Sequence, residues 1–229
     1  MAYTTINDPT QFFNTIIWSG DSSSPKTLTV GFQPDWIWGK LRNTAYSHQL
    51  YDSVRGFGSD KDLQASSNAA EGAGTADQYG YISGTTSTGF TATKGSDSGA
   101  DGYGYWNESG RTYVAWNWKA GTSFSNDASA TSVGSIDSTA SVNQTAGIGI
   151  VKYTGTGSNE TVAHGMGIAP EIMFCKNLSA SSENWVVYVE GLGNTKRLIL
   201  DTNSAVGTDA TVFNSTTPNT TVFGIGANA

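Results

Sequence analysis

Acidic residues and glycines crowd the stretch KGSDSGADGYGYWNESG at 94–110. Asp97 and Asp101, followed by Asn107 and Glu108, offer the oxygen ligands that Ca²⁺ accepts in irregular loops. The simpler interpretation is a tight turn, because aspartate and glycine both favour turns. We therefore expect no obligatory cofactor, with Ca²⁺ at Asp97 and Asp101 as the alternative.

Three aromatic residues, Tyr103, Tyr105 and Trp106, stand among the glycines of the same stretch. Exposed aromatic rings can stack on the apolar faces of sugars and can anchor binding interfaces. The competing interpretation, which we favour, is that these residues begin a strand and pack into the core. The sequence thus names Tyr103, Tyr105 and Trp106 as candidates for glycan contact and leaves core packing as the simpler alternative.

The residues that could carry out catalysis are few. Ser47, His48 and Asp52 are the residue types of a hydrolytic triad, but neighbours on a strand alternate between faces and do not converge. The other histidine, His164, stands in a glycine-flanked turn, where we expect a backbone hydrogen bond. Asp52 and Asp62 could act as a glycosidase pair, although nothing in their spacing distinguishes them from turn-forming aspartates. The sequence predicts no enzyme.

The charge of the chain limits its partners. It has 12 Lys and Arg against 19 Asp and Glu, a net charge of −7, and the basic residues are scattered. Nucleic-acid binding and adhesion to an anionic membrane need clustered basic residues, so we expect neither.

No stretch is apolar over the roughly 18 residues of a membrane span, and the N-terminal residues do not read as a signal peptide. The single cysteine, Cys175, lies in an apolar run and cannot form a disulfide within the chain.

The segments that would position these residues occur twice. Pro34 and Lys40, at either end of DWIWGK, recur with the same spacing as Pro170 and Lys176 around EIMFCK. Repeat units of this length indicate two tandem domains rather than a solenoid. Further matched pairs are Gly20 with Gly155, Tyr51 with Tyr188, Gly56 with Gly193, Leu63 with Leu200, and Phe90 with Phe223.

Short runs of alternating residues predict an almost entirely β chain. TLTVGF at 27–32 puts its apolar residues on one face, and RTYVAWNWKAG at 111–121 does the same with alternate residues. Clusters of Gly, Ser, Asn and Asp between the runs are typical of turns. Only DPTQFFNT at 8–15 predicts a turn of helix, capped by Asp8 with Pro9 as its first residue. We expect four tryptophans of the strands to lie in the core, namely Trp36, Trp38, Trp116 and Trp118.

The predicted fold class is all-β, with two tandem β-sandwich domains of jelly-roll type, the second incomplete. The first domain spans 1–121 and includes an N-terminal segment, and the second spans 147–229. Residues 122–146, rich in Ser, Thr and Ala, are interpreted as a linker. The second repeat has no counterpart of 111–121, its closing strand. We expect either a shortened chain or completion by a neighbouring chain, because an open edge invites pairing.

Three segments resemble a known family. FQPDWIWGKLRNTAYSHQLYDSVRG at 32–56, RTYVAWNWKAG at 111–121 and YTGTGSNETVAHGMGIAPEIMFCKN at 153–177 are similar to tail-fibre-like virion structural proteins of marine tailed phages. In such proteins the second repeat usually continues into a closing strand of the TYVAY type. The resemblance implies a role in the phage particle without catalysis, and it brings no functional residues with it.

From this resemblance we expect a virion structural protein, a tail fibre, appendage or surface protein that attaches to the host. It would be made in the host cytoplasm without a signal peptide. Its partners would be other virion proteins, further copies of itself (a trimer if it is a fibre) and a host surface polysaccharide. The alternatives are a carbohydrate-binding module for host glycans, capsid decoration and, less directly, a polysaccharide depolymerase.

Overall fold

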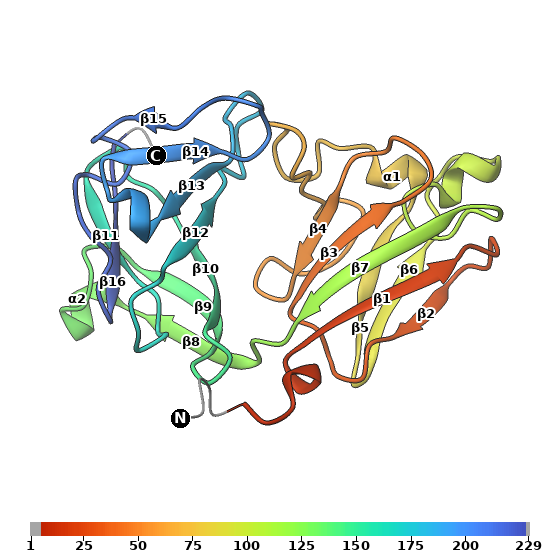
Figure 1. Cartoon of the computed structure of the whole chain (residues 1–229), viewed down its shortest axis with the longest axis horizontal. Coiled ribbons are helices and arrows are strands. Elements are labelled where there is room, and N and C mark those ends of the chain that lie inside the picture. Colours follow the sequence, from red (N-terminus) through yellow and green to blue (C-terminus); the bar gives the residue numbers. More distant parts are fainter. Residues whose placement is uncertain (1–5, 228–229) are drawn as a thin grey trace. The chain divides into compact units, whose positions relative to one another are not determined.

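The computed structural model describes residues 6–227, and these are almost entirely strand, turn and loop. The predicted all-β fold class is confirmed, since each pair of neighbouring strands in these sheets is antiparallel. No helix in this part of the chain is long and apolar enough to cross a membrane. The residues form two compact units (Figure 1). Unit 1 contains residues 6–121 with 178–182, and unit 2 contains 122–177 and 183–227.

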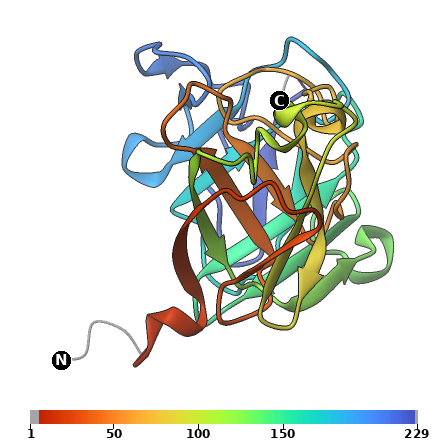
Figure 2. The same ribbon diagram turned by 90° about the vertical axis from the view of Figure 1, so that its right-hand side faces the viewer.

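Unit 1 is a β-sandwich of two antiparallel sheets (Figures 1 and 2). One sheet has the strand order β1-β7-β3-β4, and the other has the order β2-β6-β5. The long β7 is central in the first sheet, because it pairs with β1 on one side and with β3 on the other. The strands are β1 Phe13–Ser19, β2 Lys26–Thr29, β3 Trp36–Leu41, β4 Gln49–Asp52, β5 Tyr81–Thr86, β6 Gly89–Thr93 and β7 Thr112–Trp118.

Single helical turns lie between these strands. The predicted turn near the N-terminus is confirmed: the N–H of Thr10 donates to the Asp8 carboxylate at 3.0 Å, and Pro9 starts the turn. Proline suits that place because the first N–H of a helix has no partner within it. The turns of unit 1 are η1 Pro9–Gln11, α1 Ala76–Tyr79 and η2 Ala100–Tyr103.

The core of unit 1 lies between its two sheets. The face predicted for 27–32 is confirmed, since Leu28, Val30 and Phe32 are 7%, 2% and 5% exposed. From the opposite sheet, Ile37 on β3 and Ala115 on β7 are fully buried and belong to the same apolar cluster. Alternation along each strand therefore decides which side chains enter the core.

The four strand tryptophans lie on the other face of that sheet, so the prediction that they are core residues is wrong. All four are half-buried. The ring centres of Trp36 and Trp118 are 4.6 Å apart and stacked, and Trp38 meets Trp116 edge to face at 6.4 Å. Alternation along β3 and β7 gives the inward positions to other residues, among them Ile37 and Ala115, and so places the four tryptophans on the outer face.

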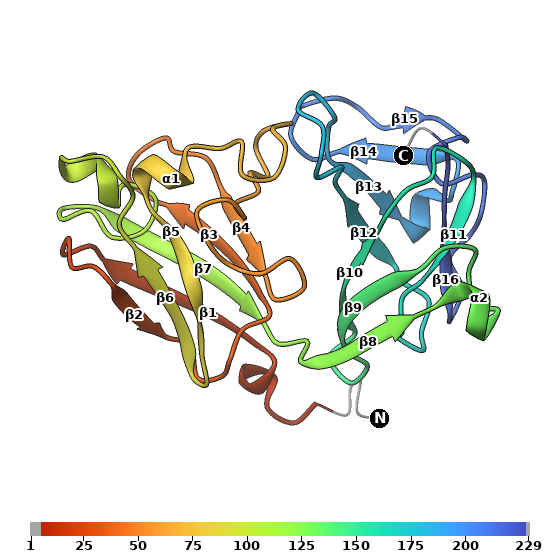
Figure 3. The same ribbon diagram turned by 180° about the vertical axis from the view of Figure 1, so that it is seen from behind.

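Unit 2 contains antiparallel sheets with the strand orders β10-β9-β8, β12-β13-β14-β15 and β11-β16 (Figure 3). Its apolar residues form several small clusters rather than one continuous core. The strands are β8 Thr122–Asn126, β9 Ser138–Asn143, β10 Ile148–Tyr153, β11 Glu160–Ala163, β12 Ile172–Cys175, β13 Val186–Val189, β14 Lys196–Ile199, β15 Gly207–Thr208 and β16 Val222–Ile225. The helical turns are α2 Ala128–Thr131 and η3 Glu190–Leu192.

The stretch 122–146 is not a linker. It forms β8, α2 and β9, and β9 pairs with β10 over its whole length. Ala140 and Val142 of β9 are 6% and 4% exposed and pack with Met166 and Phe124. Threonine is a good strand former, and small residues fit closely under larger neighbours. Composition alone therefore misidentified a folded segment as a linker.

The duplication seen in the sequence is repeated in the strand pairing of β3 with β4 and of β12 with β13. In unit 1, Ile37 stands opposite Tyr51. In unit 2, Met173 stands opposite Tyr188. Ile37 follows Pro34 at the same spacing as Met173 follows Pro170, and Tyr51 and Tyr188 are a matched pair of the repeat. The strands around DWIWGK and EIMFCK are therefore equivalent.

A second strand pair repeats in the other layer. Leu28 of β2 stands opposite Phe90 of β6, and Val162 of β11 stands opposite Phe223 of β16. All four side chains are buried. Strands β1, β2, β3, β4 and β6 of unit 1 thus correspond in chain order to β10, β11, β12, β13 and β16 of unit 2.

The lysines at the ends of DWIWGK and EIMFCK form the same kind of hydrogen bond. Lys40 Nζ donates to the carbonyl of Leu41, and Lys176 Nζ donates to the carbonyl of Asn177 at 2.9 Å. Burial lowers the pKa of both ammonium groups. Each lysine therefore closes the end of its strand.

Candidate functional site

The loop 94–110 is held firmly against unit 1. The backbone N–H groups of Trp106 and Asn107 both donate to the carbonyl of Tyr103, at 3.0 and 2.8 Å, and extend the turn that begins in η2. The Asn107 side chain is 3% exposed and donates to Asp21 and to the carbonyl of Ser23, each at 2.8 Å. These bonds fix which side chains of the loop face inward.

Two of the three predicted glycan-contact residues are inside the protein. Tyr105 is 6% exposed and Trp106 is 1% exposed. The Tyr105 hydroxyl lies 2.6 Å from the Thr75 hydroxyl, and both aromatic rings belong to the apolar core. A sugar cannot stack on a ring enclosed by protein. Glycan contact therefore does not hold for Tyr105 and Trp106, and the competing interpretation of core packing describes both.

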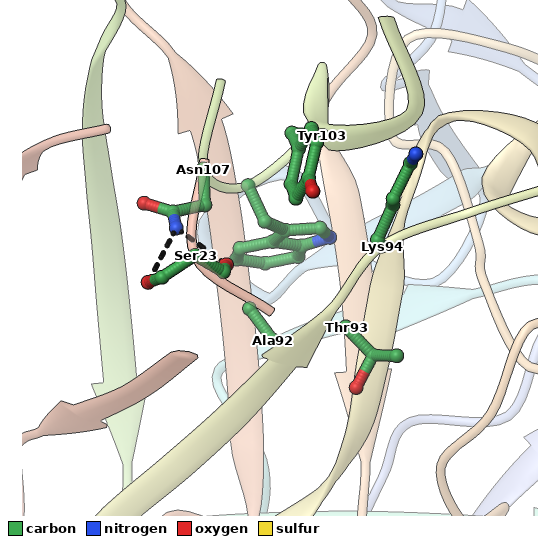
Figure 4. A pocket seen from close by; sticks show the side chains of 7 residues that line it. Ser23, Ala92, Thr93, Lys94, Tyr103 and Asn107 are labelled. Carbon is green, nitrogen blue, oxygen red and sulfur yellow. Dashed lines mark hydrogen bonds between the residues drawn. The ribbon is translucent and has the colours of Figure 1, made fainter. Parts of the chain in front are cut away.

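Tyr103 stands at the rim of a shallow recess (Figure 4). The Lys94 ammonium lies 5.0 Å from the centre of its ring, a cation–π contact. The recess is lined also by Ser23, Ala92 and Asn107 and is too small to enclose a ligand. Tyr103 is partly exposed, and glycan contact at this residue stays a prediction.

Asp97 and Asp101 do not meet at a common point with other ligands. The Asp97 carboxylate accepts the N–H of Gly99 at 2.7 Å and so closes a turn, while Asp101 is exposed within η2. Within residues 6–227, no three His, Cys, Asp or Glu side chains are grouped to hold a metal ion. The turn-forming interpretation describes Asp97, and Ca²⁺ binding by the pair stays a prediction.

Both histidines take part in structural hydrogen bonds. The indole N–H of Trp38 donates to His48 Nδ1 at 2.8 Å. The backbone hydrogen bond predicted for His164 is confirmed, because the N–H of Met166 donates to its Nδ1 at 3.1 Å. Burial lowers the pKa of both imidazoles, so both favour the neutral form that these acceptor roles need.

Asp52 and Asp62 do not face each other across a cleft. An isolated bridge pairs Leu50 with Leu63, so Asp62 shares a side of the strand pair with Tyr51 and Asp52 lies on the opposite side. The Asp52 carboxylate forms an ion pair with Arg55, and Asp62 is fully buried. These two acids therefore do not form the pair that a glycosidase places on either side of a sugar bond.

Asp62 belongs to a buried polar group that sequence reasoning missed. Both its carboxylate oxygens, the Tyr51 hydroxyl and the side-chain amide of Gln49 have no hydrogen-bond partner among the described residues. Burial raises the pKa of Asp62 to about 6, against the opposing effect of the Arg55 charge. Nothing in KDLQAS distinguishes a buried aspartate from a turn aspartate. The group costs stability when Asp62 is ionised, because a buried charge is poorly solvated.

The substitution Asp62→Asn is expected to stabilise unit 1 at pH 8 by up to about 3 kcal/mol, since two pKa units correspond to that free energy. The folded-state pKa of Asp62 lies above the unfolded one, so the stability that this one group contributes is fully present below about pH 4 and is lost as the pH rises to about 6. Urea unfolding of both proteins at pH 4, 6 and 8 measures this. Equal free energies of unfolding of the native chain and the Asp62→Asn variant at pH 8 would contradict the burial of the Asp62 carboxylate.

Among the described residues, most of the large apolar side chains that are exposed belong to unit 2. On β12, the outward Ile172 is 56% exposed and the inward Met173 is only partly buried, whereas its counterpart Ile37 in unit 1 is fully buried. Exposed apolar side chains of this size lose contact with water when a partner covers them, which favours binding. The exposed large apolar residues of unit 2 are Ile168, Ile172, Phe174, Leu192 and Val206.

The two strands of unit 2 that should flank a closing strand both end a sheet. Within the described residues, β10 pairs only with β9, and β12 pairs only with β13. Their counterparts β1 and β3 both pair with β7. No described strand of unit 2 occupies the place that β7 takes in unit 1. The open side of unit 2, defined by β10 and β12, is therefore the candidate binding site.

Comparison with protein-family models identifies a family for this chain. The model of a family described as a domain of unknown function (DUF7483) matches residues 8–229. No curated protein and no solved structure matches the chain. This match runs through both units, so the duplicated fold lies within one family domain.

Proposed function

We propose that this chain, which belongs to the DUF7483 family, is a structural protein of a bacteriophage virion, a tail fibre or appendage that acts by binding and not by catalysis. The open side of unit 2 carries the proposal. There, within the described residues, the two strands β10 and β12 each pair with one neighbour, and Ile172 on β12 is exposed. Similarity of 32–56, 111–121 and 153–177 to tail-fibre-like proteins supplies the setting.

An assembly role fits this surface for two physical reasons. Exposed edge strands present unpaired backbone groups and pair readily with other chains. Apolar side chains add area that association removes from water, and stable interfaces are built on such patches. The net charge of −7 keeps the surface soluble while the apolar side supplies the contact. The protein therefore acts as a building element of the particle, joined to further copies and to other virion proteins.

The chain is expected to be present in purified phage particles and to self-associate as the isolated protein. Mass spectrometry of gradient-purified particles detects the first, and gold-labelled antibodies in electron microscopy distinguish tail from capsid surface. Light scattering after size exclusion measures the second, with a trimer expected for a fibre.

A matched pair of variants tests the surface itself. Ile172→Ser on the open side should weaken self-association at least tenfold. Ile17→Ser in unit 1, at a residue that is 68% exposed against 56% for Ile172, should not. A chain that is absent from particles and monomeric at all concentrations would overturn the proposal.

A further inference from the structure

Strand β7 shows what the open side of unit 2 lacks. In unit 1, β7 lies between β1 and β3, and its Ala115 stands opposite Ile16 on one side and Gly39 on the other. Tyr113 and Ala115 point inward and are fully buried. The strand therefore joins the two halves of its sheet and covers the middle of the core.

The repeat gives the residues of unit 2 that correspond to Ile16 and Gly39. Because Gly20 matches Gly155, the counterpart of Ile16 is Val151 on β10. Because Lys40 matches Lys176, the counterpart of Gly39 is Cys175 on β12. A strand placed as β7 is placed would set a small inward residue between Val151 and Cys175.

The divided core of unit 2 supports this placement. Val151 is partly buried and packs against two clusters, one with Val162 and one with Val142. Met173 of β12 likewise packs against two, the Val162 cluster and another with Tyr188. Val151 of β10 and Met173 of β12 are thus partly buried residues that each contact two clusters. A strand placed between β10 and β12 would cover these residues and join the clusters into one core. In unit 1 the corresponding residues form one cluster that includes Ala115.

We propose that unit 2 binds an extended peptide segment with the residue pattern of β7 between β10 and β12, antiparallel to both strands. The segment carries an aromatic residue inward at the place of Tyr113, opposite Tyr153, and a small residue inward at the place of Ala115. Main-chain hydrogen bonds to both edges give affinity, and the small position gives specificity. The proposal rests on the proposed function, in that both assign binding to the open side of unit 2.

The test uses the full chain and a synthetic peptide of residues 111–121, RTYVAWNWKAG, titrated by calorimetry. We expect saturable binding with one peptide per chain. The Ala115→Pro version of the peptide should bind at least tenfold more weakly, because proline cannot donate to a central ladder. The Ala115→Leu version should do the same, because a large side chain cannot fit between Val151 and Cys175.

Cys175 supplies a local readout within the native chain. It is the single cysteine, and it lies partly buried on the inward face of β12. Burial raises the pKa of its thiol to about 12, so it reacts slowly with disulfide reagents. Saturating peptide should slow this reaction at least tenfold, while the Ala115→Pro peptide should leave the rate unchanged.

Each result decides the proposal. No saturable binding, equal binding of the proline peptide, or an unchanged Cys175 rate at saturation overturns it. The proposal is also overturned if two copies of the chain pair through β12, the peptide does not bind to this dimer and the peptide does not dissociate it. In that case a second copy of the chain is the occupant of the open side. Failure of peptide binding in a protein that is present in phage particles removes this inference alone, whereas absence from particles removes the proposed virion role.

Discussion

Replacing Trp106 with alanine is expected to lower the free energy of unfolding of unit 1 by about 3–5 kcal/mol, the range for removing a large buried side chain. Trp106 is 1% exposed. Its ring lies parallel to Trp18, with ring centres 6.5 Å apart, and meets Phe90 edge to face at 5.8 Å. Alanine leaves a cavity that these neighbours cannot fill without leaving their own strands.

Gly39 makes the prediction sharper. A Cβ at position 39 would lie 2.3 Å from Cη2 of Trp106, so β3 has a glycine there because the indole covers it. Gly39→Ala alone should therefore destabilise by about 1–3 kcal/mol, the usual cost of overpacking. In the Trp106→Ala background the same change meets no ring and should be nearly neutral. The two substitutions are in contact, so their effects should be strongly non-additive.

Urea unfolding followed by tryptophan fluorescence measures these effects, since six of the 7 tryptophans precede residue 122 and report mainly on unit 1. Trp116→Ala is the matched control. Trp116 is half-buried on the outer face, so a loss well below that of Trp106→Ala is expected. Additive effects of Gly39→Ala and Trp106→Ala would show that the ring does not lie over the glycine.

The strands were predictable because alternation is a local property of the sequence. Trp36 and Trp38 share one face and Ile37 takes the other, as the run DWIWGK indicates. Which of these faces is inside was not predictable, because it depends on a ring from residue 106 that lies over Gly39. A tryptophan was judged to be core by its type, whereas the long-range contact decides its place.

The candidate site divides in the same way. The sequence predicts that no segment up to residue 229 matches 111–121, and in the structure the two described strands β10 and β12 each pair with one neighbour. The composition of the glycine-rich loop 94–110 made its aromatic residues candidates for glycan contact, yet Trp106 within it is part of the core of unit 1. The burial of Asp62 has no signal in the sequence, since it follows from the Leu50–Leu63 bridge and not from the neighbouring residues of the chain.

The substitution Arg55→Met is expected to destabilise unit 1 by about 3–5 kcal/mol, the cost of breaking a buried ion pair by removing one partner. The Arg55 side chain is 6% exposed and pairs with Asp52 and with Glu71, the latter at 3.0 Å. It also donates to the carbonyl of Lys61 at 2.8 Å. Methionine keeps the apolar stem but removes the cation beside Asp52 and leaves Glu71 with the longer contact to Lys61, at 4.0 Å. Urea unfolding at pH 7 measures the loss.

Neighbouring Lys61 offers the control. Its ammonium lies 2.9 Å from Asp60 and 4.0 Å from Glu71. The side chains of Lys61 and Asp60 are 30% and 73% exposed, so Lys61→Met should cost less than about 1 kcal/mol. Adding Glu71→Gln to Arg55→Met should recover part of the loss, because one uncompensated carboxylate is then neutral. Equal small losses for Arg55→Met and Lys61→Met would mean that the guanidinium is solvated. A large loss that Glu71→Gln does not reduce would assign the effect to the Asp52 pair and the Lys61 carbonyl.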